Sequence, residues 1–222
     1  MRNQENRGAT QGVLDEALGG TPHVRILRYL CRAGGEHTGR AIGRAIQVSH
    51  PSVHRALRTL ANRGMVHAVH HGPAIAYRLN EDHWLICRGL LPLFEAEAAF
   101  LTTVGEAIRS AAGVPVRSVL VFGSVARDNA IPESDIDLLC LTASATTAEE
   151  AERNLAEAVP SLRRQFGRQV SVMALPAAEF ARRYRRRQRL AREIVETGWV
   201  IAGMSLSEVL RERLPRSGSR RR

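Results

Sequence analysis

Two short motifs separated by ten residues constrain the fold of this chain more than any other feature. Gly123-Ser124 ends one apolar run, and Asp135-Ile136-Asp137 opens another. An apolar run that stops at a glycine predicts a buried strand followed by a tight turn. Side chains two residues apart lie on the same face of a strand, so Asp135 and Asp137 are expected to point the same way.

These motifs carry groups suited to a metal and a phosphate. Neighbouring carboxylates repel each other, and a divalent cation relieves that repulsion; oxygen ligands of this kind suit Mg²⁺. A small Gly-Ser turn that leads into a helix offers backbone N–H groups and a hydroxyl to a phosphate. A metal ion beside a phosphate is the arrangement that nucleotidyl transfer uses.

The complete pattern resembles the minimal nucleotidyltransferase family of the DNA polymerase β-like nucleotidyltransferase superfamily. It includes Ala126-Arg127 after the turn and ends with Ser134-Asp135-Ile136-Asp137-Leu138-Leu139. The resemblance extends over about residues 92–203. It implies that Gly123, Ser124 and Arg127 bind a nucleoside triphosphate and that Asp135 and Asp137 bind Mg²⁺ and are catalytic. A plain βαβ core with surface acids is the alternative, since single motifs can mislead.

The chain departs from that family at one position. Family members that catalyse usually carry a third carboxylate on the next strand, after a Gly-Arg pair. Here Gly167-Arg168 is followed by Gln169 and Val170, and then by Ser171 at the position where the acid is expected. Loss of a group that can accept a proton commonly lowers the rate by about 10²–10⁴-fold. Glu133 and Glu179 are candidate replacements, although their spacing gives them no support.

Residues 22–80 predict a winged helix-turn-helix. A first helix is expected at 22–32, Thr38 can cap the second, and Ser49 or His50 can cap the third ahead of Pro51. Two strands, at 65–69 and 74–79, are expected to form a hairpin in the position of a wing. The inward residues of these helices are expected to include Ala45 in the second and Val53, Ala56, Leu57 and Leu60 in the third.

This block resembles bacterial winged-helix regulators, which implies that the third helix enters the major groove of double-stranded DNA and the wing touches the backbone. A winged helix used only for protein contacts is the alternative, because a fold alone does not establish function. The histidines have no carboxylate or cysteine at metal-ligand spacing and are expected to be polar surface. The predicted DNA contacts are Ser49, His50, Ser52, His54, Arg55, Arg58, Thr59, His70, His71 and Arg78.

The predicted organisation is α+β: a winged helix-turn-helix at 22–89, a linker helix at 90–112 and a nucleotidyltransferase-fold α/β domain at 113–203. That domain should contain a short mixed sheet and flanking helices, including one long helix at 177–196. Residues 1–21 are expected to be disordered or partly helical, and residues 204–222 to be a basic tail. The linker helix either forms a homodimer interface or packs on the second domain.

All 32 basic residues other than histidine are arginine, which excludes chemistry that needs a lysine nucleophile. Net charge is +6 over residues 1–90, −4 over 91–175 and +8 over 176–222. The arginine-rich run at 182–192 is either solvated surface or a contact for nucleic-acid backbone. No apolar run suits a membrane span or a signal peptide, so we expect a cytoplasmic protein with no membrane partner.

Two functions fit these features. The first is a DNA-binding transcriptional regulator whose second domain binds Mg²⁺ and a nucleotide, with weak or no catalysis because of Ser171. The alternative is an active, antitoxin-like nucleotidyltransferase that transfers a nucleoside monophosphate to a toxin-like protein partner or to tRNA. Antibiotic nucleotidylation gains little from a DNA-binding domain and is the least favoured.

Overall fold

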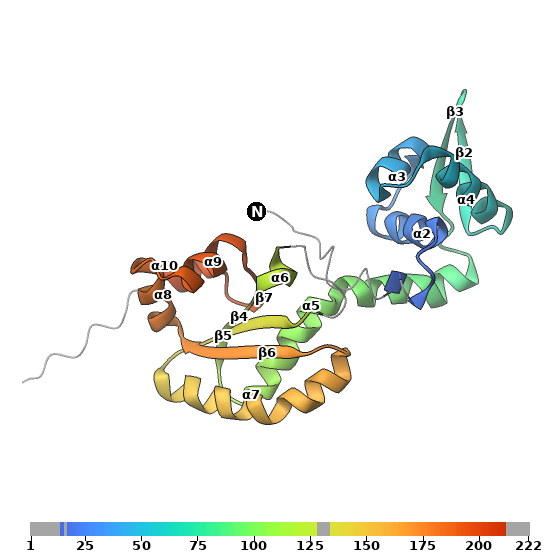
Figure 1. Ribbon diagram of the computed structural model, residues 1–222. Coiled ribbons are helices and arrows are strands. Elements are labelled where there is room, and N and C mark those ends of the chain that lie inside the picture. Colours follow the sequence, from blue (N-terminus) through green and yellow to red (C-terminus); the bar gives the residue numbers. More distant parts are fainter. Residues whose placement is uncertain (1–13, 16, 128–133, 212–222) are drawn as a thin grey trace, which may run out of the picture. The chain divides into compact units, whose positions relative to one another are not determined.

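The computed structural model describes residues 14–15, 17–127 and 134–211. They divide into two compact units, one within Thr10–Ala99 and the other within Phe100–Arg222 (Figure 1). The predicted α+β organisation is confirmed, because a helical unit with a small antiparallel sheet comes first and an α/β unit with a four-stranded mixed sheet follows. None of the helices in this part of the chain has both the length and the apolar character that crossing a membrane requires.

The first unit contains a three-helix core and a small antiparallel sheet of strand order β1-β3-β2. Its elements are α2 (Pro22–Ala33), β1 (His37–Thr38), α3 (Gly39–Ile46), α4 (His50–Asn62), β2 (Val66–His71) and β3 (Ala74–Leu79). The Thr38 hydroxyl accepts a hydrogen bond from the Ala41 amide, as expected of a helix cap. The predicted inward residues of α4 are all buried: Val53, Ala56, Leu57 and Leu60.

Two details of this unit differ from expectation. Ala45 is exposed, because Ile42 and Gly43 supply the buried face of the short helix α3. Strand β2 continues through His70 and His71, so only Gly72-Pro73 remains as the turn between the strands. The two histidines therefore belong to the paired part of the wing.

Helix α5 (Leu91–Ala111) follows a short π-helical turn, η1 (Ile86–Leu90). Phe94 is buried in the core of the first unit, whereas Leu101, Val104 and Ile108 are buried in the core of the second. Leu93 and Ala98 of this helix are exposed, whereas the charged Glu97 is buried. One helix thus contributes side chains to both cores, and whether it also forms a dimer interface stays a prediction.

The second unit contains a four-stranded mixed sheet of order β6-β5-β4-β7. Strand β5 runs parallel to β6 and antiparallel to β4, which also pairs antiparallel with β7. Its elements after α5 are β4 (Val116–Phe122), α6 (Gly123–Ala126), β5 (Ile136–Thr142), α7 (Ala145–Phe166), β6 (Val170–Pro176), α8 (Ala177–Arg185), α9 (Arg189–Thr197), β7 (Trp199–Gly203) and α10 (Leu206–Arg211).

Helices cover both faces of this sheet (Figure 1). Alternate residues of each strand point to opposite faces, so Leu138 and Leu139 lie in different cores. Leu138 packs in the core that α5 and α7 share, and Leu139 packs in the core under α8, α9 and α10. Asp135 and Asp137 therefore lie at the N-terminal end of a strand that is buried on both faces.

The single helix predicted at 177–196 is wrong, because the chain forms α8 and α9 with a corner between them. Arg187 adopts a positive φ of 55° at this corner. Phe180 of α8 and Ile194 of α9 are both about 1% exposed, and they pack in one core from the two sides of this corner. Tyr184 and Leu190, on either side of the corner, are 37% and 40% exposed.

Two further elements were not expected from the sequence. Strand β7 closes the sheet beside β4, and α10 lies within the range expected to be a basic tail. Val209 of α10 is buried against the same core as α8 and α9. The packed part of the second unit therefore continues past residue 203 into α10, and residues 212–222 lie outside the described part of the chain.

Candidate functional site

The Gly123 turn lies directly against Asp137. Gly123 has a positive φ of 71° and opens α6 immediately after β4, while Phe122 is the register partner of Asp137 across β4 and β5. A Cβ atom on Gly123 would collide with the Oδ2 atom of Asp137. Only glycine fits both the backbone conformation and the space. Ser124, the next residue, is half-buried in the first turn of α6.

Asp135 and Asp137 stand at the entrance to β5, which begins one residue later than predicted, at Ile136. Asp135 is exposed and Asp137 is half-buried. Burial raises the pKa of Asp137, and the neighbouring Asp135 carboxylate raises it further. A bound divalent cation would relieve both effects, so the donor set fits Mg²⁺. The metal and catalytic roles of these two residues stay predictions.

Two contacts from the residues just before β6 hold the segment that carries these acids. The buried Arg168 side chain donates a hydrogen bond of 3.0 Å from Nε to the Ser134 carbonyl oxygen. The Ile136 amide donates to the Gln169 carbonyl oxygen at 2.9 Å. Asp135 lies between these two attachment points. Sequence reasoning recognised Arg168 only as part of a family pattern and did not assign it this contact.

Ser171 occupies the neighbouring position on the next strand, as the family pattern implied. It is the register partner of Asp137 in the parallel β5–β6 pair and is exposed. Glu179 is paired with Arg182 and Arg183 of its own helix, and Glu133 lies outside the described residues. Within residues 14–15, 17–127 and 134–211, no three His, Cys, Asp or Glu side chains group closely enough to hold a metal ion. Mg²⁺ commonly binds one or two carboxylates and takes its other ligands from water and substrate phosphates.

A third carboxylate approaches the site from α9. Glu193 is ion-paired with Arg127, the residue that ends α6 and that was expected to bind nucleotide. Both charges act on Asp137, because Arg127 lowers its pKa and Glu193 raises it. Glu193 stands 56 positions beyond Asp137 in the sequence, and no spacing motif links them. Only the packing of α9 beside α6 brings it here.

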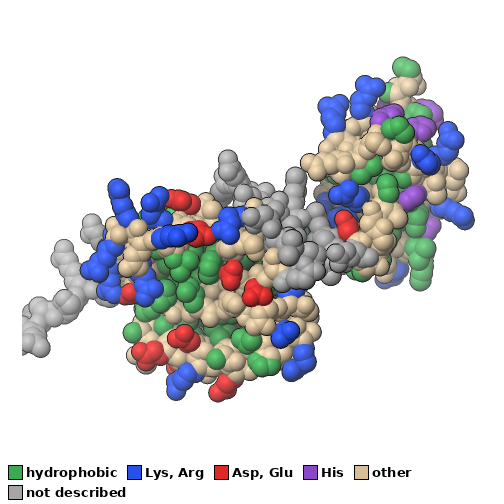
Figure 2. Space-filling view, in the orientation of Figure 1, with side chains coloured by type: hydrophobic (Ala, Val, Ile, Leu, Met, Phe, Trp, Pro, Cys, Tyr) green, Lys and Arg blue, Asp and Glu red, His purple; other side chains and the backbone are tan. Residues whose placement is uncertain are grey.

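The outer face of α4 carries the predicted DNA contacts. His54, Arg55, Arg58 and Thr59 are exposed, opposite the buried apolar residues of the helix. Figure 2 shows basic and histidine side chains together on the visible face of this unit. The rings of His50 and His54 stack one turn apart, with centroids 6.3 Å apart. Ser49 lies just before the helix, and its hydroxyl donates to Ser52 Oγ at 3.0 Å.

The wing supplies the other predicted contacts. His70, His71 and Arg78 are exposed, and Arg78 is the register partner of His67 towards the base of the hairpin. The Nε2 atom of His71 lies 2.6 Å from a carboxylate oxygen of Glu36, so a phosphate would have to compete with that carboxylate. Sequence reasoning did not anticipate the His71–Glu36 contact. DNA contact by these residues stays a prediction.

Two family models match the chain, each over a different part. The MarR family model matches residues 6–73, and the model of the nucleotidyltransferase domain matches residues 103–196. None of the curated proteins matches the chain.

Three solved structures illustrate the similarity. The homodimeric winged helix-turn-helix DNA-binding domain of a possible ArsR-family transcriptional regulator from Mycobacterium bovis is 27% identical, with a TM-score of 0.29 over 43% of this chain and 88% of its own. The antimony-specific transcriptional repressor AntR is 20% identical, with a TM-score of 0.28 over 44% and 95%. A toxin–antitoxin with AMP-PNP is 16% identical, with a TM-score of 0.31 over 49% and 77%. Because these TM-scores are low, the two domains are assigned from the family models.

Proposed function

Because the chain joins a winged helix-turn-helix domain to a nucleotidyltransferase domain, we propose that it is a DNA-binding transcriptional regulator whose second domain binds Mg²⁺ and a nucleotide. Arg55 and Arg58 of α4 contact double-stranded DNA. Gly123, Ser124 and Arg127 bind the phosphates, and Asp135 and Asp137 bind the metal ion. The regulator acts as a homodimer, since winged-helix proteins commonly read two half-sites.

The register of β5 and β6 supports binding rather than turnover. Ser171 lies beside Asp137, where a third carboxylate would complete the metal site and accept the proton of the attacking hydroxyl. Serine is a poor metal ligand and is not a base at neutral pH. The remaining groups can hold a metal–nucleotide complex but supply no base on this strand. Catalysis is therefore weak or absent.

One observation favours the alternative, an active nucleotidyltransferase. Glu193 brings a carboxylate from α9 to Arg127, although Asp135, Asp137 and Glu193 do not group closely enough to hold a metal ion together. If a bound nucleotide draws Arg127 to its phosphates, Glu193 becomes available to an acceptor hydroxyl. The acceptor in this alternative is a toxin-like protein or tRNA.

Paired substitutions in the two domains test the proposal. Arg55→Ala with Arg58→Ala should weaken DNA binding at least about tenfold, because each arginine that contacts a base edge contributes roughly 1–3 kcal/mol. Nucleotide binding should stay unchanged. Asp135→Asn with Asp137→Asn should abolish Mg²⁺-dependent nucleotide binding and leave DNA binding intact. Promoter footprinting and titration calorimetry with each nucleoside triphosphate measure the two activities.

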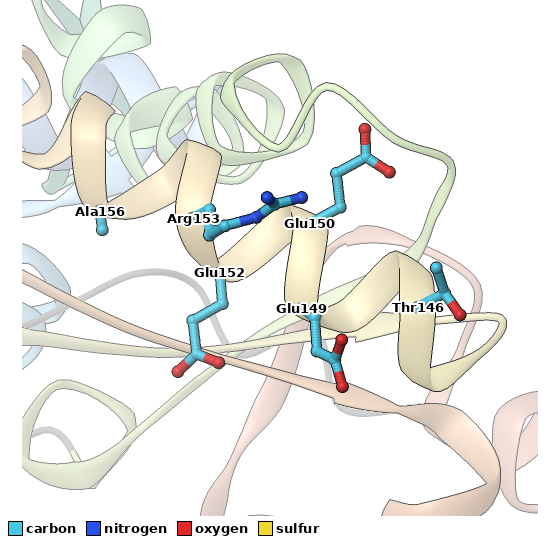
Figure 3. A pocket seen from close by; sticks show the side chains of 6 residues that line it. All are labelled: Thr146, Glu149, Glu150, Glu152, Arg153 and Ala156. Atoms are coloured by element: carbon cyan, nitrogen blue, oxygen red, sulfur yellow. The ribbon is translucent and has the colours of Figure 1, made fainter.

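Helix α7 provides matched controls for both pairs. Arg163→Ala with Arg164→Ala removes two exposed arginines, and Glu149→Gln with Glu152→Gln removes two exposed carboxylates. Figure 3 shows Glu149 and Glu152 on the surface of α7. Neither control pair should change DNA or nucleotide binding. Crossed effects, in which an α4 pair removes nucleotide binding or an acidic pair removes DNA binding, would contradict the assignment of roles.

Restoring the missing acid tests the catalytic part. With Ser171→Asp, transfer of labelled nucleoside monophosphate to protein or RNA should rise by about 10²–10⁴-fold if base loss limits the reaction. The assay includes the product of the neighbouring gene as an acceptor. Label transfer by the wild-type protein that is lost in Glu193→Gln would instead establish the enzymatic alternative.

A further inference from the structure

The corner between α8 and α9 gathers a group of arginines that neither proposed site uses. We call Arg185, Arg186, Arg187 and Arg189 the arginine corner; all four are exposed. The positive φ of Arg187 turns the chain, and the Gln188 amide donates to the Arg183 carbonyl oxygen at 3.1 Å. The turn brings Arg185 and Arg187 to one open hollow of the surface, and Arg186 and Arg189 lie beside them in the sequence.

The acids of the same helices do not neutralise the corner. Residues 177–197 contain seven arginines and three glutamates, which leaves a net charge of +4. Glu179 is paired with Arg182 and Arg183, Glu193 with Arg127, and Glu196 with Arg192. Each of these acids therefore pairs with an arginine outside the corner. The local field is positive and suits a polyanion.

An aromatic ring lies within this positive surface. Tyr184 is 37% exposed, and it lines an open hollow together with Arg185, Arg187, Arg192 and Glu196. Figure 2 shows basic side chains clustered over this side of the unit. An exposed aromatic among arginines offers a stacking surface for a planar base in addition to the charge that attracts phosphates.

The opposite face of the sheet has a different character. The first half of α7 carries Glu149, Glu150 and Glu152 around another shallow hollow, with Arg153 beside them (Figure 3). A polyanion would be repelled there and attracted to the α8–α9 side. Within this unit, the surface of the first half of α7 is therefore acidic and the α8–α9 surface is basic.

We propose that the arginine corner and Tyr184 bind a single-stranded segment of nucleic acid. The guanidinium groups contact successive phosphates, and the Tyr184 ring stacks on an unpaired base. A duplex keeps its bases stacked on one another and offers none to Tyr184, so this ligand differs from the double-stranded DNA proposed for α4. RNA and single-stranded DNA share the required phosphates and free base faces. The proposal does not depend on nucleotide binding or catalysis.

Anisotropy titrations of the full-length protein with labelled 12-nucleotide RNA and single-stranded DNA test this site. All variants carry Arg55→Ala and Arg58→Ala to remove the α4 contribution. Arg185→Gln, Arg187→Gln and Arg189→Gln together should weaken binding at least about tenfold, and the salt dependence, log K against log salt, should become shallower by about 2 because each phosphate contact contributes about 0.7. Tyr184→Leu should weaken binding roughly 5- to 100-fold without changing that slope.

The matched control is the triple variant Arg153→Gln, Arg163→Gln and Arg164→Gln on α7, which removes the same charge from exposed positions of the same unit. It should bind like its parent. Tighter binding of RNA or of single-stranded DNA identifies the source of the ligand. If the corner variant melts below its parent, the single variant Arg189→Gln carries the test.

Three outcomes would overturn the proposal. Tyr184→Leu could bind like its parent, the α7 triple could lose as much affinity as the corner triple, or poly-glutamate could bind as tightly as the oligonucleotides. The first two would indicate general charge attraction without a built site. The third would indicate an acidic protein partner.

Discussion

Gly123 shows how one residue can be fixed by its neighbour. Its positive φ and the adjacent Asp137 carboxylate both exclude a side chain. We predict that Gly123→Ala destabilises the second unit by about 1–3 kcal/mol, through backbone strain and overpacking. Nucleotide affinity should fall at least tenfold because Asp137 is displaced. Chemical denaturation and calorimetry measure the two effects.

Gly167 is a suitable control for that substitution. It also has a positive φ, of 65°, but a Cβ atom there would meet nothing within 4 Å. Gly167→Ala should therefore share the backbone strain and leave nucleotide affinity unchanged. Equal loss of nucleotide affinity in both variants would show that the contact with Asp137 is unimportant.

The raised pKa of Asp137 makes a second prediction at the scale of single residues. Because the folded protein holds this proton more tightly than the unfolded chain, its ionisation removes stability as pH rises through the folded pKa. In EDTA, Asp137→Asn should therefore be more stable than wild type at pH 7, and the difference should vanish below the unfolded pKa of about 4. Thermal melts across pH 3–8 check this. The prediction would be contradicted if the stability of Asp137→Asn relative to wild type were lower at pH 7 than at pH 3.

At the scale of elements, a buried ion network joins α2 to the start of α5. Arg28 is only 5% exposed; it pairs with Asp15 at 2.6 Å and with Glu97 at 2.8 Å, and its guanidinium lies 5.5 Å from the Phe94 ring centroid. Arg32 also pairs with Glu97. The helical periodicity of the apolar residues in α2 and α5 did not predict that these charged side chains are buried.

We predict that Glu97→Gln destabilises the first unit by about 3–5 kcal/mol, because two arginines would lose a buried carboxylate partner. Glu95→Gln, on the exposed side of the same helix, should change stability by less than about 0.5 kcal/mol. The free energy of unfolding, measured for each unit separately by denaturation, distinguishes the effects of the two variants. A destabilisation confined to the second unit would show that Glu97 acts elsewhere.

The corner between α8 and α9 illustrates a limit of helical periodicity. The residues on both sides of the corner have the periodicity of a helix, so residues 177–196 predict one continuous helix. Phe180 and Ile194 pack in one core from the two sides of the break at Arg187. The same break exposes Tyr184 and gathers the arginine corner.

On the scale of the whole molecule, two units with separate cores hold the two proposed binding sites. α4 and the wing lie in the first unit, and the Gly123 turn with Asp135 and Asp137 lies in the second. We propose domain limits of 22–89 and 113–203, with the helix at 90–112 between them, although α10 also packs in the second core. Coupling between DNA and nucleotide binding would require two states of the protein that both ligands bias.

Local patterns predicted much of each unit. The buried face of α4, the Thr38 cap, the mixed sheet and the position of Ser171 beside Asp137 all follow from short-range spacing or from a family pattern. Strand β7, α10, the buried Glu97 and the Arg168–Ser134 contact were missed. Each of these depends on a partner far away in the sequence, which periodicity does not report.

Contiguous residues were enough to predict two successive domains, and a glycine turn and paired acids at adjacent strand ends. The surroundings of these features depend on contacts between distant parts of the chain. Folding placed Glu193 at Arg127, enclosed Arg28 and Glu97, and turned the arginine run into a corner. Burial and charge pairing depend on which surfaces contact each other in the folded chain. These contacts bring together residues that are far apart in the sequence, so local spacing does not predict them.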